Sequence, residues 1–209
     1  MVNPYAAFDT LYILAAIGTN VKRPVIAEIH VFAYLACLLS LYRGQPVADW
    51  GYGFAGTRDG SPFSPEIDEA IRALMAAGYL HSSEGDIAIT GSGRAELATL
   101  QEFFQNRERI SYLEPACSST LTMPVGMIRH ALTQEPTLKP TSRLTTTRAL
   151  LEGPYLPRLY DQFAALGRAV GVEHRDLLIP ATVWLGYLWR ASEMQDDLIA
   201  SGQGDAGRG

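Results

Sequence analysis

One long apolar segment limits the folds open to this chain more than any other feature of its sequence. Between Pro24 and Tyr42 the apolar residues are spaced so that they cover most of the circumference of a helix. Pro24 suits the first turn of such a helix, and Gly44 suits its end. Because a helix that is apolar on most sides must be covered on most sides, we expect it to form the centre of the fold.

Composition favours a well-packed globular protein. The chain has 209 residues, of which 47% are hydrophobic and 19% charged, enough for one large domain or two small ones and unlike a disordered chain. No basic region precedes the first apolar stretch, and Asp9 interrupts it, so no secretion signal is expected. Cys37 and Cys117 stand in apolar surroundings, which predicts buried reduced thiols. We therefore expect a soluble cytoplasmic protein.

Two segments are apolar enough to be compared with membrane spans. Pro24–Tyr42 carries Glu28 and His30 near its middle. Leu177–Trp189 is shorter than the roughly 20 residues that a span requires, and it contains Pro180. Both are better explained as buried helices, so we expect no membrane association.

The first half of the chain alternates helices with short extended segments. Ser64 and Pro65 form a strong helix start, and the Ser-Glu-Gly turn that begins at Ser83 separates two short β segments. This order is typical of winged-helix domains, in which a hairpin leans on the helices beside it. The predicted elements are a helix at 5–17, the central helix, an extended segment at 50–54, a helix at 64–77, a hairpin at 79–90 and a helix at 94–106.

The second half is predicted to be all-helical. The expected helices are 107–113, 124–132, 142–151, 156–170 and 175–200, separated by prolines. The fold class predicted for the whole chain is mainly α with a small β-hairpin, a winged-helix-like N-terminal half followed by an all-helical C-terminal half. The corresponding domains are residues 1–106 and 107–200, with a flexible tail at 201–209.

No catalytic, cofactor or metal motif is supported by its context. Gly51–Gly56 matches G-x-G-x-x-G, but the segment is not placed between a strand and a helix, so we interpret it as a connector with packed aromatics. Neighbouring acids such as Asp68 and Glu69 do not converge on one point of a helix. The histidines are too far apart for a helical metal pair: His30, His81, His130 and His174. We expect no cofactor and no enzyme, although an active site built from scattered residues stays open.

Charge argues against DNA binding by the winged-helix-like unit. Residues 1–105 hold six Lys/Arg and eleven Asp/Glu, and the helix expected in a DNA groove is itself acidic. Basic residues are instead concentrated between residues 129 and 175, which contain seven Lys/Arg and four Asp/Glu. Ordinary surface charge is one explanation of this segment, and weak DNA contact is the other. The candidate nucleic-acid contacts are Arg143, Arg148 and Arg158.

Aromatic residues cluster on the last long helix. Trp184, Tyr187 and Trp189 are close enough in sequence to form either part of the core or a surface presented to a protein partner. Large aromatic side chains supply much of the binding energy at interfaces. Both interpretations stay open, and these three residues are the candidate partner interface.

Three segments resemble the small middle component of bacterial three-component ABC ATPase defence systems of the Lamassu type. They are Asp49–Tyr52, Gly60–Ile67 and Leu74–Leu80, and the likeness covers roughly residues 24–98. The shared pattern is structural, so it carries over no functional residue. A weaker likeness is to winged-helix antitoxin-like domains.

The resemblance implies a non-enzymatic accessory subunit that links an SMC-like ATPase to an effector subunit in an antiviral defence complex. It implies protein partners, with DNA contact through the basic segment as a secondary role. A winged-helix antitoxin or a transcriptional regulator is the alternative function.

Overall fold

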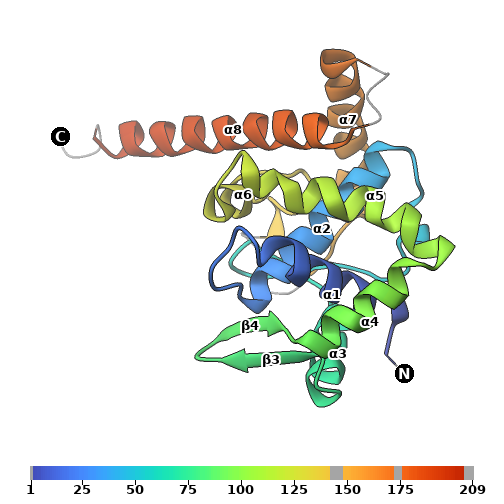
Figure 1. The fold of residues 1–209 in the computed structure, drawn as a ribbon. Helices are drawn as coiled ribbons and strands as arrows, with labels where there is room; N and C mark the ends of the chain where they lie inside the picture. Colours follow the sequence, from blue (N-terminus) through green and yellow to red (C-terminus); the bar gives the residue numbers. More distant parts are fainter. Residues whose placement is uncertain (1, 142–147, 172–175, 205–209) are drawn as a thin grey trace.

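The protein is mainly helical, with two small antiparallel sheets (Figure 1). The computed structural model describes residues 2–141, 148–171 and 176–204. The helices are α1 (Pro4–Ile17), α2 (Ile26–Tyr42), α3 (Pro65–Ala76), α4 (Gly91–Gln101), α5 (Phe104–Ser118), α6 (Val125–Leu132), α7 (Leu156–Val170) and α8 (Leu178–Gly204). The strands are β1 (Ala55–Gly56), β2 (Pro62–Phe63), β3 (Leu80–Ser83), β4 (Asp86–Ile89) and β5 (Arg148–Ala149).

Helix α2 is the centre of the fold, which confirms the prediction made from its apolar pattern. Every residue from Ile29 to Leu41 is buried. Helices α1 and α5 pack against it, and β2 lies alongside. The helix begins two residues after Pro24, where the side chain of Glu28 accepts a hydrogen bond from the backbone N–H of Val25 at 3.0 Å.

The extended segment expected at 50–54 is absent, and the strand begins at Ala55 instead. Val47–Trp50 forms a 3-10 turn, and Gly51 then adopts a left-handed φ of 89° that no regular strand contains. Trp50, Tyr52 and Phe54 are all buried, as expected for a glycine-rich connector with packed aromatics.

The second half is not all-helical. Strand β5 pairs with β1, with Ala149 opposite Ala55 and Arg148 opposite Gly56. The prediction of a helix at 142–151 is therefore wrong at its C-terminal end. The pairing with β1 satisfies the backbone hydrogen-bonding groups there, and Leu151 has a left-handed φ of 61°. Residues 142–147 lie outside the described residues.

The hairpin and the helix before it form as predicted. Ser64 precedes α3, and its backbone N–H donates to Nδ1 of His30 at 3.2 Å. The β3–β4 turn places Glu84 and Gly85 at φ of 55° and 89°, the left-handed pair that a two-residue hairpin turn uses. Helix α1 packs against α3, α4 and β4. The hairpin is a two-stranded sheet of its own, separate from β1.

The helix expected at 94–106 is two helices. Helix α4 begins at Gly91 and ends at Gln101, and α5 begins at Phe104. The chain turns because Phe103 is extended, with ψ of 132°, and the Asn106 side chain donates to the carbonyl of Leu100 at 2.7 Å. Phe103 and Phe104, at this turn, are 53% and 86% exposed.

A continuous core runs across the predicted boundary between residues 106 and 107. That boundary lies inside α5, whose Leu113 and Ala116 are fully buried in the same cluster as α1 and α2. Arg109 of α5 reaches Asp9 of α1, and its Nη2 donates to Oδ2 of Asp9 at 2.7 Å. The two predicted halves therefore share one core.

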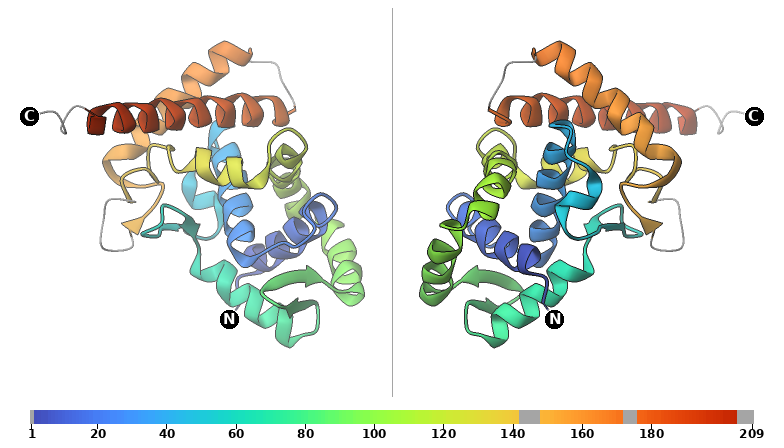
Figure 2. Two further views of the ribbon diagram at one scale, coloured as in Figure 1. Left: turned by 90° about the vertical axis from the view of Figure 1, so that its left-hand side faces the viewer. Right: turned by 90° about the vertical axis from the view of Figure 1, so that its right-hand side faces the viewer.

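Helices α7 and α8 lie at one end of the molecule, and the β3–β4 hairpin with α3 lies at the other (Figures 1 and 2). Residues 201–204, predicted to belong to a flexible tail, are part of α8, which continues to Gly204; residues 205–209 lie outside the described residues. Among the helices that the structure describes, none combines the length and the hydropathy needed to cross a membrane.

Candidate functional site

The structure brings two of the three candidate nucleic-acid contacts together in one cleft. Arg148 of β5 and Arg158 of α7 line a cleft of about 540 Å³, together with Lys139. Arg143 lies outside the described residues. Tyr187, a candidate for the partner interface, lines the same cleft from α8. Residues proposed for two separate roles are thus neighbours.

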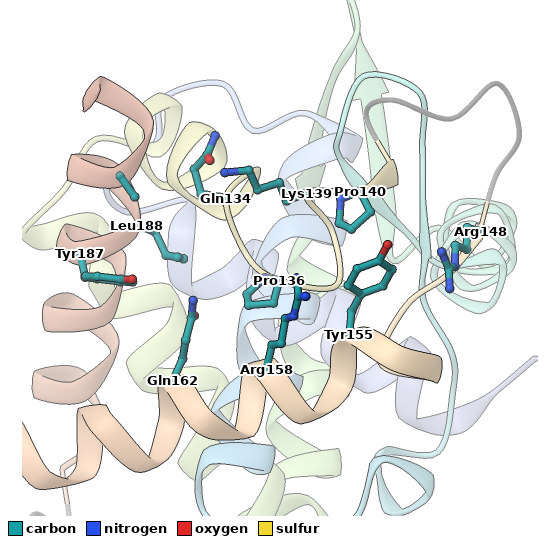
Figure 3. A pocket seen from close by; sticks show the side chains of 11 residues that line it. Gln134, Pro136, Lys139, Pro140, Arg148, Tyr155, Arg158, Gln162, Tyr187 and Leu188 are labelled. Carbon is teal, nitrogen blue, oxygen red and sulfur yellow. The ribbon is translucent and has the colours of Figure 1, made fainter. Parts of the chain in front are cut away.

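Four segments form the walls of this cationic cleft: β5, α7 with the residue before it, α8 and the 134–140 segment. We define the cleft by Lys139, Arg148, Tyr155, Arg158, Gln162 and Tyr187. Figure 3 shows Arg158 and Gln162 rising from α7 into the cleft, Tyr187 and Leu188 entering from α8, and Lys139 lying along the opposite wall. That wall is the 134–140 segment. Among the described residues that line the cleft, none is acidic.

The start of α7 positions the cleft's central residues. Tyr155 immediately precedes the helix, and Arg158 and Gln162 follow at spacings of three and four residues, so all three project from one side. Leu159, Phe163 and Leu166 are buried on the other side. The helix can therefore pack its apolar face inward while it presents this polar row to the cleft.

Tyr155 gathers the two arginines. The guanidinium carbon of Arg148 lies 5.2 Å from the centre of the Tyr155 ring, and that of Arg158 lies 5.8 Å from it. Both distances are within the range of cation–π attraction. Within the part of the chain that the structure describes, neither guanidinium has an ion-pair or hydrogen-bond partner. Among these described residues, no acceptor competes with a ligand for the donors of either arginine.

A buried carboxyl group fixes the 134–140 wall to the core. The side chain of Glu135 is fully buried, and it accepts hydrogen bonds from the backbone N–H groups of Thr137 and Leu138 at 2.9 and 2.7 Å. The hydroxyl of Tyr34, at the centre of α2, donates to the same carboxyl at 2.8 Å. Glu135 points away from the cleft, whereas its neighbours Gln134 and Pro136 line the cleft.

Burial sets the ionisation of this network. It raises the pKa of Glu135, an effect that the hydrogen bonds from Thr137, Tyr34 and Leu138 oppose. Burial, followed by the charge of Glu135, raises the pKa of Tyr34 well above its usual value. Tyr34 is therefore a hydrogen-bond donor throughout the physiological pH range, which keeps the wall attached to α2.

The three aromatic residues of α8 occupy different environments. Trp184 is buried and donates from Nε1 to Oε1 of Gln162 at 3.2 Å, so it belongs to the core. Trp189 is half-buried against His130, with 5.3 Å between the ring centres. Tyr187 is 55% exposed. Of the candidate partner interface, Tyr187 presents the most surface.

An exposed apolar stripe continues from Tyr187 along α8. We define the α8 stripe as Ile179, Val183, Tyr187 and Met194, which are 42%, 45%, 55% and 64% exposed. Spacings of four, four and seven residues place all four on one face of the helix. Beside the stripe, an apolar groove of about 260 Å³ separates α7 from α8 and is lined by Ala165, Leu166 and Val183. Sequence analysis missed the stripe because aliphatic residues on that face are also compatible with burial.

Other candidates from the sequence have structural roles. Cys37 and Cys117 are buried and free, and burial raises the pKa of both thiols. Gly56 packs so closely against Thr141 that a Cβ would lie 2.5 Å from that side chain. Among the described residues, no group of three or more His, Cys, Asp or Glu is placed to hold a metal ion.

Known proteins give no guide to the site. No protein-family model, curated protein or solved structure matches the chain. Its function is therefore argued from the cationic cleft and the α8 stripe.

Proposed function

We propose that this protein is a non-enzymatic accessory subunit that binds a protein partner through the α8 stripe. The observation that carries the proposal is the row of exposed apolar side chains on α8, whose opposite face is already buried in the core through Ala181, Leu185 and Leu188. Because contiguous exposed apolar surface is uncommon on proteins that act alone, we expect a partner to cover the face of α8 that the core does not cover.

The shape of this surface favours a helical partner. The stripe follows one face of α8, and the apolar groove beside it runs between two helices. An amphipathic helix can place its own apolar row against such a groove, as helices do in coiled coils. A long coiled-coil ATPase of the SMC-like type, the partner implied by the Lamassu-type resemblance, offers such helices. The bacterial defence role is proposed on the same resemblance.

The opposite end of the molecule supports a bridging role. We propose that α3, β3, β4 and α4 form a winged-helix-like unit that faces the effector subunit. The β3–β4 hairpin is the wing of this unit, and Arg23 neutralises part of its negative charge through ion pairs to Glu84 at 3.2 Å and to Asp86 at 2.9 Å. Helix α3 keeps an acidic first turn at Glu66 and Asp68, which favours a protein surface over DNA phosphates.

The test is co-purification with the proteins encoded beside it. We expect the wild-type chain to recover a stoichiometric ATPase with long coiled coils. The double variant Ile179→Glu/Val183→Glu should reduce recovery by about tenfold or more, because it places charges where apolar side chains are to be buried. Phe104→Glu is the control, since it changes an even more exposed apolar residue, which lies on α5 and outside the α8 stripe.

Two outcomes would contradict the proposal. Equal recovery with the double variant would show that the α8 stripe is not the interface. Recovery of the wild-type chain alone, as a monomer or homodimer, would favour a stand-alone regulator instead.

A further inference from the structure

We infer that the cationic cleft binds a nucleoside phosphate, with the phosphate at its arginine end and the base at its Tyr187 end. The inference does not require the protein partner proposed for α8, although Tyr187 belongs both to the α8 stripe and to the cleft. It assigns a small-molecule ligand to a site whose walls come from β5, α7, α8 and the 134–140 segment.

The positive charge of the cleft indicates that its ligand is an anion. Lys139, Arg148 and Arg158 line a single concave surface, and the lining residues that the structure describes include no carboxylate. Like charges that share a site repel one another, and a bound anion relieves that repulsion. Arg158 is exposed and Arg148 is half-buried, so solvent anions can reach both guanidinium groups.

The arrangement of the arginines favours phosphate. Arg148 and Arg158 flank one ring, that of Tyr155, at 5.2 and 5.8 Å, and Figure 3 shows the two side chains on opposite sides of that ring. A guanidinium group binds two oxygens of a phosphate at once, with a geometry that a lysine ammonium lacks. Arg158, on the side of the ring that faces α8, can therefore hold a phosphate through charge-assisted hydrogen bonds, and Arg148 adds positive charge at the same end of the cleft.

The far end of the cleft has a different chemistry. Tyr187 and Leu188 supply an aromatic ring and an aliphatic surface there. The Gln162 Oε1 atom accepts from Trp184, which orients the amide and leaves its NH2 group to donate. A planar base can stack on Tyr187 and accept a hydrogen bond from the Gln162 amide.

The size of the cleft agrees with such a ligand. Its volume of about 540 Å³ lies within the roughly 300–1,000 Å³ of small-molecule sites. A free nucleotide and the terminal nucleotide of a single strand share this chemistry. We assign the free nucleotide, because the cleft is a concave site of limited volume, whereas contact with a nucleic-acid strand extends along a groove that follows its backbone.

The experiment is calorimetric titration of the full chain with AMP and ATP. We expect binding, and we expect Arg148→Gln/Arg158→Gln to weaken it by about tenfold or more, since each charge-assisted hydrogen bond contributes on that scale. The control Arg129→Gln/Arg168→Gln removes the same charge from two exposed positions that do not line the cleft, and it should bind as the wild type does. Circular dichroism checks that both variants are folded.

Further titrations distinguish the contacts to the base from those to the phosphate, and a free nucleotide from a nucleic-acid strand. Tyr187→Ala should weaken AMP binding and leave inorganic phosphate binding unchanged. Three results would overturn the inference: no binding of either nucleotide by the folded wild type, equal loss in the control pair, or inorganic phosphate binding as tightly as AMP. Tighter binding of a 5′-phosphorylated oligonucleotide, or of duplex DNA, through the same arginines would overturn the assignment to a free nucleotide. The Ile179→Glu/Val183→Glu variant should still bind AMP, so this test and the partner test can fail separately.

Discussion

At the scale of single residues, His30 illustrates a role that its sequence neighbours do not disclose. It lies on the central helix α2 and is buried, at 4% exposure. Its hydrogen bond is not local, because Nδ1 accepts from the backbone N–H of Ser64 at the start of α3. A neutral imidazole is required for that bond, and burial lowers the pKa of His30 to about 4, against a small opposing effect of Asp68.

The depressed pKa of His30 predicts a loss of stability in mild acid. The unfolded chain binds a proton near pH 6.5 and the folded chain near pH 4, so stability falls as pH decreases between these values. The loss amounts to about 3 kcal/mol in the free energy of unfolding. Urea unfolding of wild type and His30→Asn between these pH values measures it, because the asparagine oxygen can accept the Ser64 N–H but does not titrate.

We expect His30→Asn to lose about 3 kcal/mol less than the wild type over that range. The raised pKa of Glu135 acts in the opposite direction, since its protonation favours the folded state as pH falls, and both proteins contain it. His81→Asn, at an exposed position, is the control and should follow the wild type. Parallel pH profiles for wild type and His30→Asn would contradict the prediction.

At the scale of elements, the start of α4 shows how a helix and a hairpin determine each other's position. Gly91, Ser92 and Gly93 form the first turn of α4. Thr90 caps that turn by accepting from the backbone N–H of Gly93 at 3.1 Å, and its hydroxyl lies 2.9 Å from the carbonyl of Gly78. The turn is held directly against the chain that enters the hairpin.

This close approach predicts opposite effects for two neighbouring glycines. A Cβ on Gly93 would lie 2.2 Å from the carbonyl oxygen of Tyr79, whereas a Cβ on Gly91 would meet nothing within 4 Å. We expect Gly93→Ala to reduce the free energy of unfolding by about 2 kcal/mol or more. Gly91→Ala should be neutral or stabilising by up to about 1 kcal/mol. Urea unfolding of the two variants tests this, and equal stabilities would show that the approach is not tight.

At the scale of the whole molecule, the ion pair between Asp9 of α1 and Arg109 of α5 joins the start of the chain to its second half in one core. Both side chains are buried, and Arg109 also donates from Nη1 to the carbonyl of Trp50 at 2.8 Å and lies 3.8 Å from the Trp50 ring centre. Burial disfavours the charge of Arg109, but the charge and hydrogen bonds of Asp9, together with Tyr52, more than offset burial and raise the pKa of Arg109. Arg109 therefore stays charged inside the core.

The shared core predicts that residues 1–106 do not fold by themselves. Removing α5 leaves Asp9 as an uncompensated buried charge, which costs about 3–5 kcal/mol, and it uncovers the apolar surface of α2. We expect the isolated fragment to lack cooperative unfolding and to bind a hydrophobic dye, whereas the full chain unfolds in one transition. Cooperative thermal unfolding of the fragment, followed by circular dichroism, would instead show that the first half is an independent domain.

Local signals in the sequence determined much of the secondary structure. The apolar circumference of 24–42 determined the central helix, the Ser-Pro pair at Ser64 determined the start of α3, and the bounds of α7 agree with the predicted 156–170. The hairpin at 79–90 also forms. Each of these depends on periodicity, capping or turn preference, which act within a few residues and can be recognised without knowledge of the rest of the chain.

Only the tertiary structure decided which distant segments meet. The pairing of Ala149 with Ala55, the burial of Trp184 beside an exposed Tyr187, and the convergence of Lys139, Arg148 and Arg158 in one cleft depend on how the helices pack. Sequence composition identified the basic segment but not its concave arrangement. The physical reason is that the effect of a charge or an aromatic ring depends on the residues that surround it in space, and the packing of the folded core determines which residues those are.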